Sequence, residues 1–337
     1  MRRLITSTIF TLAIVALYQF IDINLFTIDL PRRVRCELFK SLRYDPEVDP
    51  SILILDIEYI KLEEVKAKLE VLESMGPKAI GVNLCNMEER SQVLDNYLNQ
   101  SKNIITCDCK TNSNKGTSRI TSPENEVTHF LTDKDSYFEL QLADGSKEFE
   151  GRGNNSERIN FRAKDMYYRF PLSELDNVLP DLVKNQIVLV GFLRDSLVTP
   201  MNHWYGRPSA SEGDMSDAQI SANIISTINR NEFINEVSPL LRVLLILLVS
   251  LICTVLIRLV HTKYNVINII LALAILIILN GLSSYIIVFA FSRDYYLKLD
   301  EMTVVLIISA AASVYWNAEG NKAPANNGVH MSLPGKS

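Results

Sequence analysis

Four long apolar segments constrain this chain more than any other feature of its sequence. Residues 4–21 carry no charged side chain and directly follow Arg2 and Arg3. Three further apolar segments lie toward the C-terminus, at 240–260, 266–291 and 302–316. An α-helix of about 20 apolar residues is long enough to cross the hydrocarbon core of a bilayer. The sequence therefore predicts four transmembrane helices, of which 302–316 is the shortest.

The first apolar segment has a second interpretation, as a cleaved signal peptide. A signal peptide normally ends in two small residues that are separated by one other residue, just before its cleavage site. No such pair precedes Asp22, and the residues that follow are bulky or acidic. An uncleaved membrane anchor is therefore favoured.

Positive charge beside these segments predicts their orientation. Arg2 and Arg3 precede the first helix, and Arg258 and Lys263 border the turn between the second and the third. The segment 292–300, in contrast, balances acidic and basic residues. Because Lys and Arg accumulate on the cytoplasmic side of membrane proteins, both chain ends are predicted to lie in the cytoplasm.

This orientation divides the chain into an exported domain and short cytoplasmic ends. The domain, residues 30–235, is expected outside the inner membrane of a bacterial cell, in the periplasm. Residues 1–3 form the cytoplasmic N-terminus. Residues 317–337 are rich in Asn, Gly, Ala and Pro and are predicted to be a disordered cytoplasmic tail. The lipid bilayer is thus the first expected partner.

Short apolar runs alternate with helical periodicity along the exported domain, a pattern typical of a mainly parallel sheet with crossover helices. The predicted strands are 52–55, 78–84, 103–106, 158–161 and 186–191, and the predicted helices are 62–75, 90–100 and 217–229. Gly76 followed by Pro77 marks the end of the first of these helices.

The polar segment 110–158 is predicted to form long loops with one ordered piece. Residues 137–142 alternate apolar and polar side chains, which is typical of a strand, and Asp144-Gly145 favours a tight turn after it. The predicted fold class is therefore an α/β exported domain, with a mainly parallel sheet, crossover helices and a β-hairpin, attached to four transmembrane α-helices.

Composition narrows the partners and the metal chemistry. The net charge is -5, and Lys and Arg do not form a stripe interleaved with aromatic residues, so nucleic acid is not an expected partner. In an oxidising compartment Cys85 and Cys107 are a candidate disulfide, and buried thiols are the alternative. Cys107 and Cys109 have no His or Cys at zinc-finger spacing, so no metal site is predicted.

Charged residues next to predicted strands are the candidate ligand-binding groups. Asp56 and Glu58 follow a strand, at the edge where open α/β sheets bind ligands, and their carboxylates suit a cation or a basic ligand. Arg162 follows another strand and could clamp an anion through two hydrogen bonds. The structural alternative stays open: the carboxylates could cap the next helix or pair with Arg162 or Arg194.

Catalytic and cofactor motifs do not stand out in this sequence. The chain has no Gly-x-Ser-x-Gly elbow and no Gly-rich phosphate loop, and its four histidines are scattered. The protein is therefore not expected to be an enzyme or to carry a cofactor.

Taken in order, these pieces resemble the CHASE family of sensory domains, second type (cyclases/histidine kinases associated sensory extracellular). The similar segments are 52–58, 76–83, 159–162, 170–175, 186–191 and 218–223, with Asp195 and Thr199-Pro200 before the last of them. One helix before the domain and three after it also match the layout of the family. The resemblance covers nearly the entire chain.

The resemblance adds Asn83 and Asp195, the latter beside Arg194, to the candidate ligand-binding residues. Asn83 stands where the family commonly has Asp, and Gln219 and Ser221 stand where it usually has Glu and His. The ligand chemistry that those groups supply in other members is therefore expected to differ here.

The resemblance also implies a sensory function exerted through a separate protein. Members often continue into a kinase or cyclase module, whereas only residues 317–337 follow the last predicted helix here. The expected partner is a signalling effector, and a homodimer is left open. A non-catalytic scaffold or assembly subunit of an envelope complex is the main alternative, which an exposed apolar patch on the domain would favour over a polar pocket.

Overall fold

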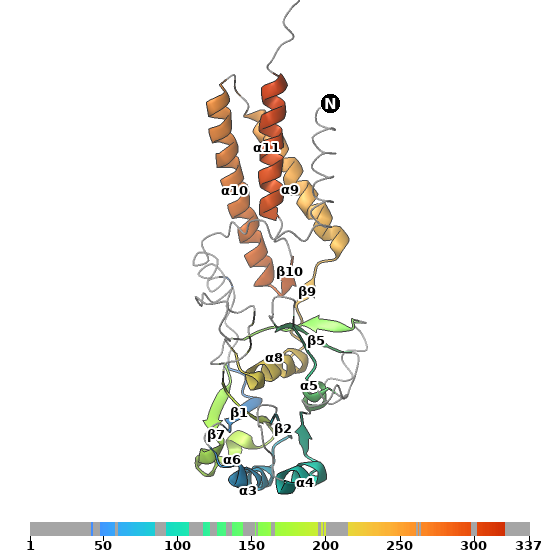
Figure 1. Ribbon diagram of the computed structural model, residues 1–337, viewed down its shortest axis with the longest axis vertical. Coiled ribbons are helices and arrows are strands. Elements are labelled where there is room, and N and C mark those ends of the chain that lie inside the picture. Colours follow the sequence, from blue (N-terminus) through green and yellow to red (C-terminus); the bar gives the residue numbers. More distant parts are fainter. Residues whose placement is uncertain are drawn as a thin grey trace, which may run out of the picture. The chain divides into compact units, whose positions relative to one another are not determined.

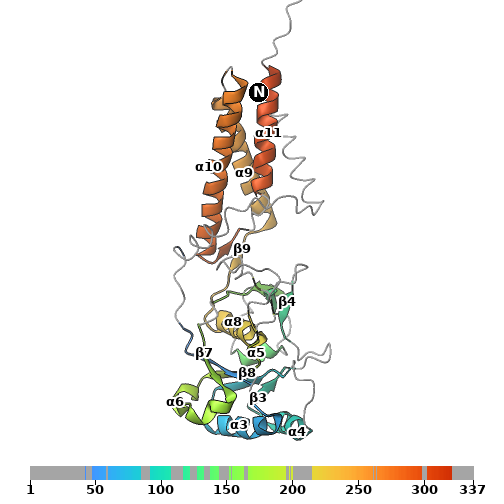
Figure 2. The ribbon, with the colours of Figure 1, turned by 60° about the vertical axis from the view of Figure 1, so that its left-hand side comes forward.

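The computed structural model in Figures 1 and 2 describes two compact units of the chain. The described residues are 42, 48–57, 60–84, 92–107, 117–121, 127–132, 137–143, 152, 154–162, 166–194, 197, 199, 215–260, 262, 264–297 and 302–320. Pro31–Asn235 and Phe289–Tyr296 make up one unit, here called the α/β unit. Met1–Leu30, Glu236–Val288 and Leu297–Ser337 make up the other, here called the helical unit.

A five-stranded parallel sheet forms the centre of the α/β unit. Its strands, in the order β3-β2-β8-β1-β7, are β3 (Ile104–Thr106), β2 (Ala79–Val82), β8 (Ile187–Gly191), β1 (Ile52–Asp56) and β7 (Tyr168–Pro171). All four neighbouring pairs run parallel. The sequences of β1 and β8 are continuous apolar runs, as expected for strands that are buried on both faces. The predicted parallel sheet with crossover helices is confirmed.

Helices cover both faces of this sheet (Figures 1 and 2). One core contains Leu53, Leu55, Val188 and Val190 with apolar side chains of α3 (Leu62–Ser74), α4 (Gln92–Gln100), the 3-10 helix η2 (Leu172–Asn177) and α6 (Pro180–Val183). The other contains Ile52, Ile54, Ile187 and Leu189 with apolar side chains of α5 (Phe138–Leu142) and α8 (Asp217–Asn229). The side chains of β1 and β8 thus alternate between the two cores, as the pleat of a strand requires.

Two glycines have clear physical reasons. Gly76 ends α3 with a φ of 72°, a left-handed conformation that favours glycine, which agrees with the predicted helix stop. At Gly81 in β2, an added Cβ would lie 2.4 Å from Leu142 Cδ1 and 2.9 Å from Phe138 Cζ. The missing side chain therefore lets α5 pack directly on the sheet.

The structure corrects the prediction of a strand at 137–142. Phe138–Leu142 form the short helix α5. The alternating pattern implied that Glu139 faces solvent, but Glu139 is completely buried and accepts hydrogen bonds from Ser118 and Ser221. The predicted turn at Asp144-Gly145 lies outside the described residues.

A three-stranded antiparallel sheet occupies the region that was predicted to be mostly loops. Its strands, in the order β4-β5-β6, are β4 (Arg119–Thr121), β5 (Val127–Leu131) and β6 (Ser156–Arg158). β4 and β5 are antiparallel neighbours along the chain, so the unit does have a hairpin, but at another place than predicted. β6 overlaps only the first residue of the strand predicted at 158–161.

The helical unit contains three described helices: α9 (Pro239–Leu259), α10 (Asn265–Phe291) and α11 (Met302–Gly320). They share an apolar core that includes Ile246, Cys253, Leu279 and Leu306. The hydroxyls of Ser250 and Ser309 lie 2.7 Å apart and form a hydrogen bond between α9 and α11.

Two of these helices, α9 and α10, are long and apolar enough to cross a membrane, as judged by length and composition. The apolar part of α11, Val305–Tyr315, is shorter, which agrees with the prediction that the last segment is the shortest. The first predicted helix, 4–21, lies outside the described residues. Four transmembrane helices therefore remain a prediction.

Candidate functional site

The carboxyl edge of the parallel sheet brings together two of the predicted ligand-binding residues. Asp56 is the last residue of β1, and its Cα partner on β8 is Gly191. Asn83 follows β2 on the other side of β8, and its backbone N–H donates to the carbonyl of Val190 at 2.8 Å. Asp56 and Asn83 therefore flank β8 at the edge where parallel α/β sheets present groups to ligands.

The first turn of α8 packs against this edge. A Cβ at Gly191 would lie 3.3 Å from the Asn83 carbonyl oxygen and 3.6 Å from the Ala218 Cβ, so strand and helix approach closely. α8 begins with a capping box: the backbone N–H of Gln219 donates to the Ser216 hydroxyl, and the Ser216 N–H donates to Gln219 Oε1 at 2.9 Å. Gln219, which departs from the usual family residue, thus has a local structural role.

Buried charges near the start of α8 are paired with one another. Arg119 on β4 forms an ion pair with Asp217, in which the two side chains are 21% and 12% exposed. Burial lowers the pKa of the Arg119 guanidinium, and the charge of Glu139 opposes this shift. Ser221 donates to Glu139 Oε1 at 3.0 Å, so the second departure from the family pattern holds α8 to α5.

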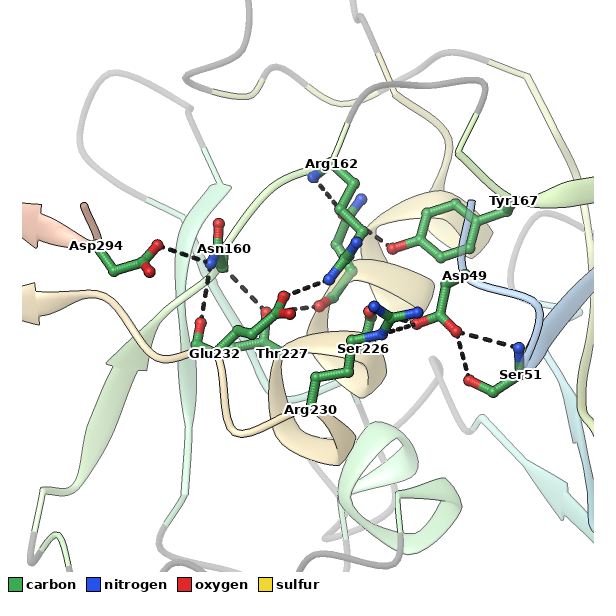
Figure 3. A network of polar contacts seen from close by, with 11 residues as sticks. Asp49, Ser51, Asn160, Arg162, Tyr167, Ser226, Thr227, Arg230, Glu232 and Asp294 are labelled. Atoms are coloured by element: carbon green, nitrogen blue, oxygen red, sulfur yellow. Dashed lines mark hydrogen bonds and ion pairs between the residues drawn. The ribbon is translucent and has the colours of Figure 1, made fainter. Parts of the chain in front are cut away.

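The second half of α8 carries a different polar cluster, centred on Asp49 (Figure 3). This carboxylate is 1% exposed and accepts hydrogen bonds from the hydroxyls of Ser51 and Ser226, both at 2.6 Å, and from Arg230 Nε at 3.1 Å. Burial would raise the pKa of Asp49, but the donors from Ser226, Ser51 and Arg230 outweigh it and lower the pKa. Asp49 is therefore held ionised and ties the entry of β1 to the end of α8.

Arg162 belongs to the same region, where Asn223 of α8 connects it to Tyr167. The side-chain amide oxygen of Asn223, Oδ1, accepts from the Arg162 backbone N–H at 2.7 Å and from the Tyr167 hydroxyl at 3.1 Å. The Arg162 guanidinium, on a side chain that is 2% exposed, forms an ion pair with Glu232. Burial raises the pKa of Tyr167 well above its usual range, so this hydroxyl stays a donor.

Asn160 extends the cluster to a residue far along the chain. Its side-chain amide donates to the Glu232 carbonyl at 3.0 Å and to Asp294 Oδ1 at 3.2 Å, and its backbone N–H donates to Thr227 Oγ1 at 3.1 Å. We call the set around the second half of α8 the α8 network. Its members, all labelled in Figure 3 except Asn223, are Asp49, Ser51, Asn160, Arg162, Tyr167, Asn223, Ser226, Thr227, Arg230, Glu232 and Asp294.

The predicted ligand-binding residues thus fall into separate places. Asp56 and Asn83 share the carboxyl edge, whereas Arg162 lies in the α8 network and meets a carboxylate of this chain. Arg194 is exposed, three residues after the end of β8. Glu58 and Asp195 lie outside the described residues, and a ligand-binding role for any of the six stays a prediction.

The candidate disulfide also stays a prediction, because Cys85 lies outside the described residues. Cys107, which follows β3, is buried with 2% of its surface exposed. Within the described ranges, no group of three or more His, Cys, Asp or Glu side chains is placed to hold a metal ion.

Sequence reasoning missed most of the α8 network. Asn160 and Asn223 lie inside segments that carried the family resemblance, so their positions were signalled without their roles. Asp49, Glu232 and Asp294 had no such signal, because their partners come from distant parts of the chain.

Comparison with known proteins identifies one family. The model of that family, described as the CHASE2 domain, matches residues 8–257. The match includes the carboxyl edge, most of the α8 network and nearly all of α9. No curated protein and no solved structure matches the chain.

Proposed function

The chain belongs to the CHASE2 domain family, and from this membership we propose that it is a membrane-anchored sensory protein that signals through a separate partner. The observation that carries the proposal is the family match, because CHASE2 is a sensory domain of signalling proteins and the match spans the whole described sheet. In this proposal the protein is not an enzyme. The α/β unit lies outside the cytoplasm and perceives a ligand or a state there.

The surface of α9 and α10 supports a membrane location. Apolar side chains that are more than half exposed lie along both helices: Leu240, Leu244, Leu248, Leu259, Val266, Ile270, Leu273, Ile277, Ile278 and Leu282. Such a surface is costly in water and favourable against lipid tails. We assign α9, α10, α11 and the segment 4–21 to four spans of a bacterial inner membrane.

The carboxyl edge is the proposed ligand site. Asp56 supplies a carboxylate and Asn83 an amide at the ends of the two strands that flank β8, and this pair suits a cation or a basic group of a small ligand. In the sequence, Glu58 comes shortly after β1, and Arg194 and Asp195 come shortly after β8. These three residues complete the proposed set. In this assignment Arg162 serves the α8 network instead, where it already has an ionic partner.

The topology is tested with alkaline phosphatase, which is active only after export, fused after residue 150 and after residue 262. We expect activity from the fusion at 150 and none from the fusion at 262. A cytoplasmic fluorescent protein fused at the same two positions should give the opposite pattern. An inactive phosphatase at 150 would contradict the proposed orientation.

The sensory function is tested on the full-length protein in lipid nanodiscs. A panel of divalent cations, amino acids and polyamines is screened for compounds that raise its melting temperature, and chemical crosslinking in native membranes is used to find partners. We expect a stabilising compound and a crosslinked effector with its own signalling domain. A panel without any effect, together with crosslinks only to structural envelope proteins, would contradict the sensor.

A scaffold is the second candidate, because two apolar side chains that are close in the sequence are exposed on the α/β unit. Leu179, just before α6, is 67% exposed, and Leu182 within α6 is 42% exposed. Replacing both by Ser should abolish crosslinks to envelope proteins if the unit docks through them, and should leave those crosslinks unchanged if it is a sensor. The Val93→Ser variant, which changes another exposed apolar residue, on α4, is the matched control.

A further inference from the structure

The segment Phe289–Tyr296 connects α10 to α11 but packs within the α/β unit. α10 ends inside it at Phe291, and α11 begins shortly after it at Met302. We call this segment the docking loop. It is the part of the helix-to-helix connection that the α/β unit holds directly.

Asp294 makes two of the contacts that hold the docking loop. Its carbonyl oxygen accepts from the backbone N–H of Asn235 at 2.7 Å, and its Oδ1 accepts from Asn160 Nδ2 at 3.2 Å. The residue has a φ of 62°, a left-handed conformation that Asp tolerates better than most non-glycine residues. A strained backbone position that is held by side-chain and main-chain hydrogen bonds is typical of switch regions.

Tyr296 makes a third contact. The Arg158 guanidinium, at the end of β6, lies 3.8 Å from the centroid of the Tyr296 ring, within the range of a cation–π interaction. Phe291 packs edge-on against the same ring, with 6.1 Å between the centroids. The two ends of the docking loop are thus closed on each other and fixed to the antiparallel sheet.

Asn160 connects the docking loop to α8. The same side-chain amide that donates to Asp294 also donates to the Glu232 carbonyl, and the Glu232 carboxylate pairs with buried Arg162 (Figure 3). A shift at the end of α8 that moves the Glu232 carbonyl is therefore expected to move the Asn160 amide as well. That amide is the donor to Asp294.

We propose that the docking loop is a latch through which the α8 network reports the state of the α/β unit to α10 and α11. When the Asn160–Asp294 bond is intact, the loop is held at the C-terminal end of α10, and when α8 shifts, the bond opens and the loop that leads to α11 is released. The direction of signalling rests on the proposed sensory function. The mechanical coupling between α8 and the loop does not.

The coupling is tested by hydrogen exchange and mass spectrometry on the full-length protein in nanodiscs, without any ligand. Asp294→Gly removes the acceptor but keeps the left-handed backbone accessible, whereas Asp294→Asn keeps both an acceptor and that backbone preference. Exchange is followed in residues 226–236, 289–297 and 302–310, with residues 62–74 of α3 as an internal control.

We expect Asp294→Gly to raise exchange about fivefold in 289–297, as for one lost hydrogen bond, and by at least about twofold in 226–236 and 302–310. Glu232→Gln, which removes the charge that pairs with Arg162 in the α8 network, should raise exchange in the same three windows. If the network and the docking loop are coupled, a change in either one should affect the other. Asp294→Asn and the α3 window should stay close to the wild type.

An increase confined to 289–297 in Asp294→Gly, or equal effects of Asp294→Gly and Asp294→Asn, would overturn the latch. This readout is independent of the sensor test above. If the exchange windows are coupled but the sensor test finds neither a ligand nor an effector, only the sensory function is contradicted. If a ligand is found but the windows are uncoupled, only the latch is contradicted.

Discussion

The two ends of α8 are stabilised in different ways. At its start, the helix is capped by its own residues, Ser216 and Gln219, and it meets a sheet edge that carries Asp56 and Asn83. At its end, the polar groups are joined to residues from distant parts of the chain: Asp49 lies 181 positions from Arg230. The comparison indicates that the cap at the start of α8 is built by local residues, whereas the polar groups at its end join distant segments of the chain.

The largest loss of stability is expected from Asp49→Ala, in the α8 network at the end of the helix. This substitution removes the acceptor of Ser51, Ser226 and Arg230, of which Ser226 is completely buried. Because the Arg230 side chain is 33% exposed, we expect a loss of about 3 kcal/mol in the free energy of unfolding, the low end for a broken buried ion pair. Urea denaturation of the protein in detergent, followed by pulse proteolysis, measures it. Asp49→Asn, which keeps an acceptor, should lose clearly less, and equal losses would show that the carboxylate charge does not matter.

An asymmetric effect is expected for the ion pair between Arg162 and Glu232. Glu232→Ala leaves the guanidinium buried without this carboxylate, and we expect it to cost about 2 kcal/mol. Arg162→Met costs about 1 kcal/mol, because the Glu232 side chain is 39% exposed and water can solvate it. The same denaturation assay compares the two variants. If Arg162→Met were the more damaging, the Arg162 contacts to other groups would outweigh its charge.

Acidification should weaken the contacts that Asp49 makes in the α8 network. The pKa of Asp49 is lower in the folded protein than in the unfolded chain, so its contribution is complete above the unfolded value near 4 and is lost as the pH falls through the folded value. The difference in melting temperature between the wild type and Asp49→Asn should be constant from about pH 7 to pH 5 and should shrink below about pH 4. Asp181→Asn on the exposed part of α6 is the control. A difference that grows on acidification would have the wrong sign.

The parts of the fold that follow from local pattern were predictable, and those that depend on distant partners were not. β1, β8 and α8 have continuous or periodic apolar side chains, and the structure places them where they were predicted. β7 was missed because Tyr168–Pro171 is short, largely polar or aromatic and ends in Pro. At α5, the alternating apolar and polar residues were interpreted as a strand with Glu139 facing solvent, whereas Glu139 is buried.

The same distinction applies to the candidate site. The carboxyl edge could be predicted in part: Asp56 was expected there because it ends a strand, whereas Asn83 entered the candidate set only through the family resemblance. The α8 network could not, because nothing in the local sequence indicates that Asp49 and Arg162 contact α8 or that Asp294 contacts Asn160.

A smaller effect is expected at the start of α8. Ser216→Ala removes the hydroxyl that accepts from the Gln219 N–H, and loss of such a cap costs about 1 kcal/mol. Ser216→Asp, which restores an acceptor at the N-cap, should recover most of this loss in the same denaturation assay. Because the cap is local, hydrogen exchange in 226–236 should stay unchanged, and an increase there would show that the two ends of α8 are not independent.

The smallest effect on stability, with a large effect on binding, is expected from Asp56→Asn at the carboxyl edge. Asp56 Oδ1 accepts a long hydrogen bond, 3.4 Å from the Leu193 N–H, and Asn retains an acceptor there. We expect the free energy of unfolding to change by less than about 0.5 kcal/mol. Any cation or amine that stabilises the wild-type protein should lose at least about tenfold in affinity, because the variant lacks the carboxylate charge. Asn83→Asp, which adds a carboxylate to the same edge on the other side of β8, should instead strengthen the binding of a divalent cation. If both variants leave the affinities unchanged, the ligand site lies away from this edge. The start of α8 would then differ from its end in structure only, not in function.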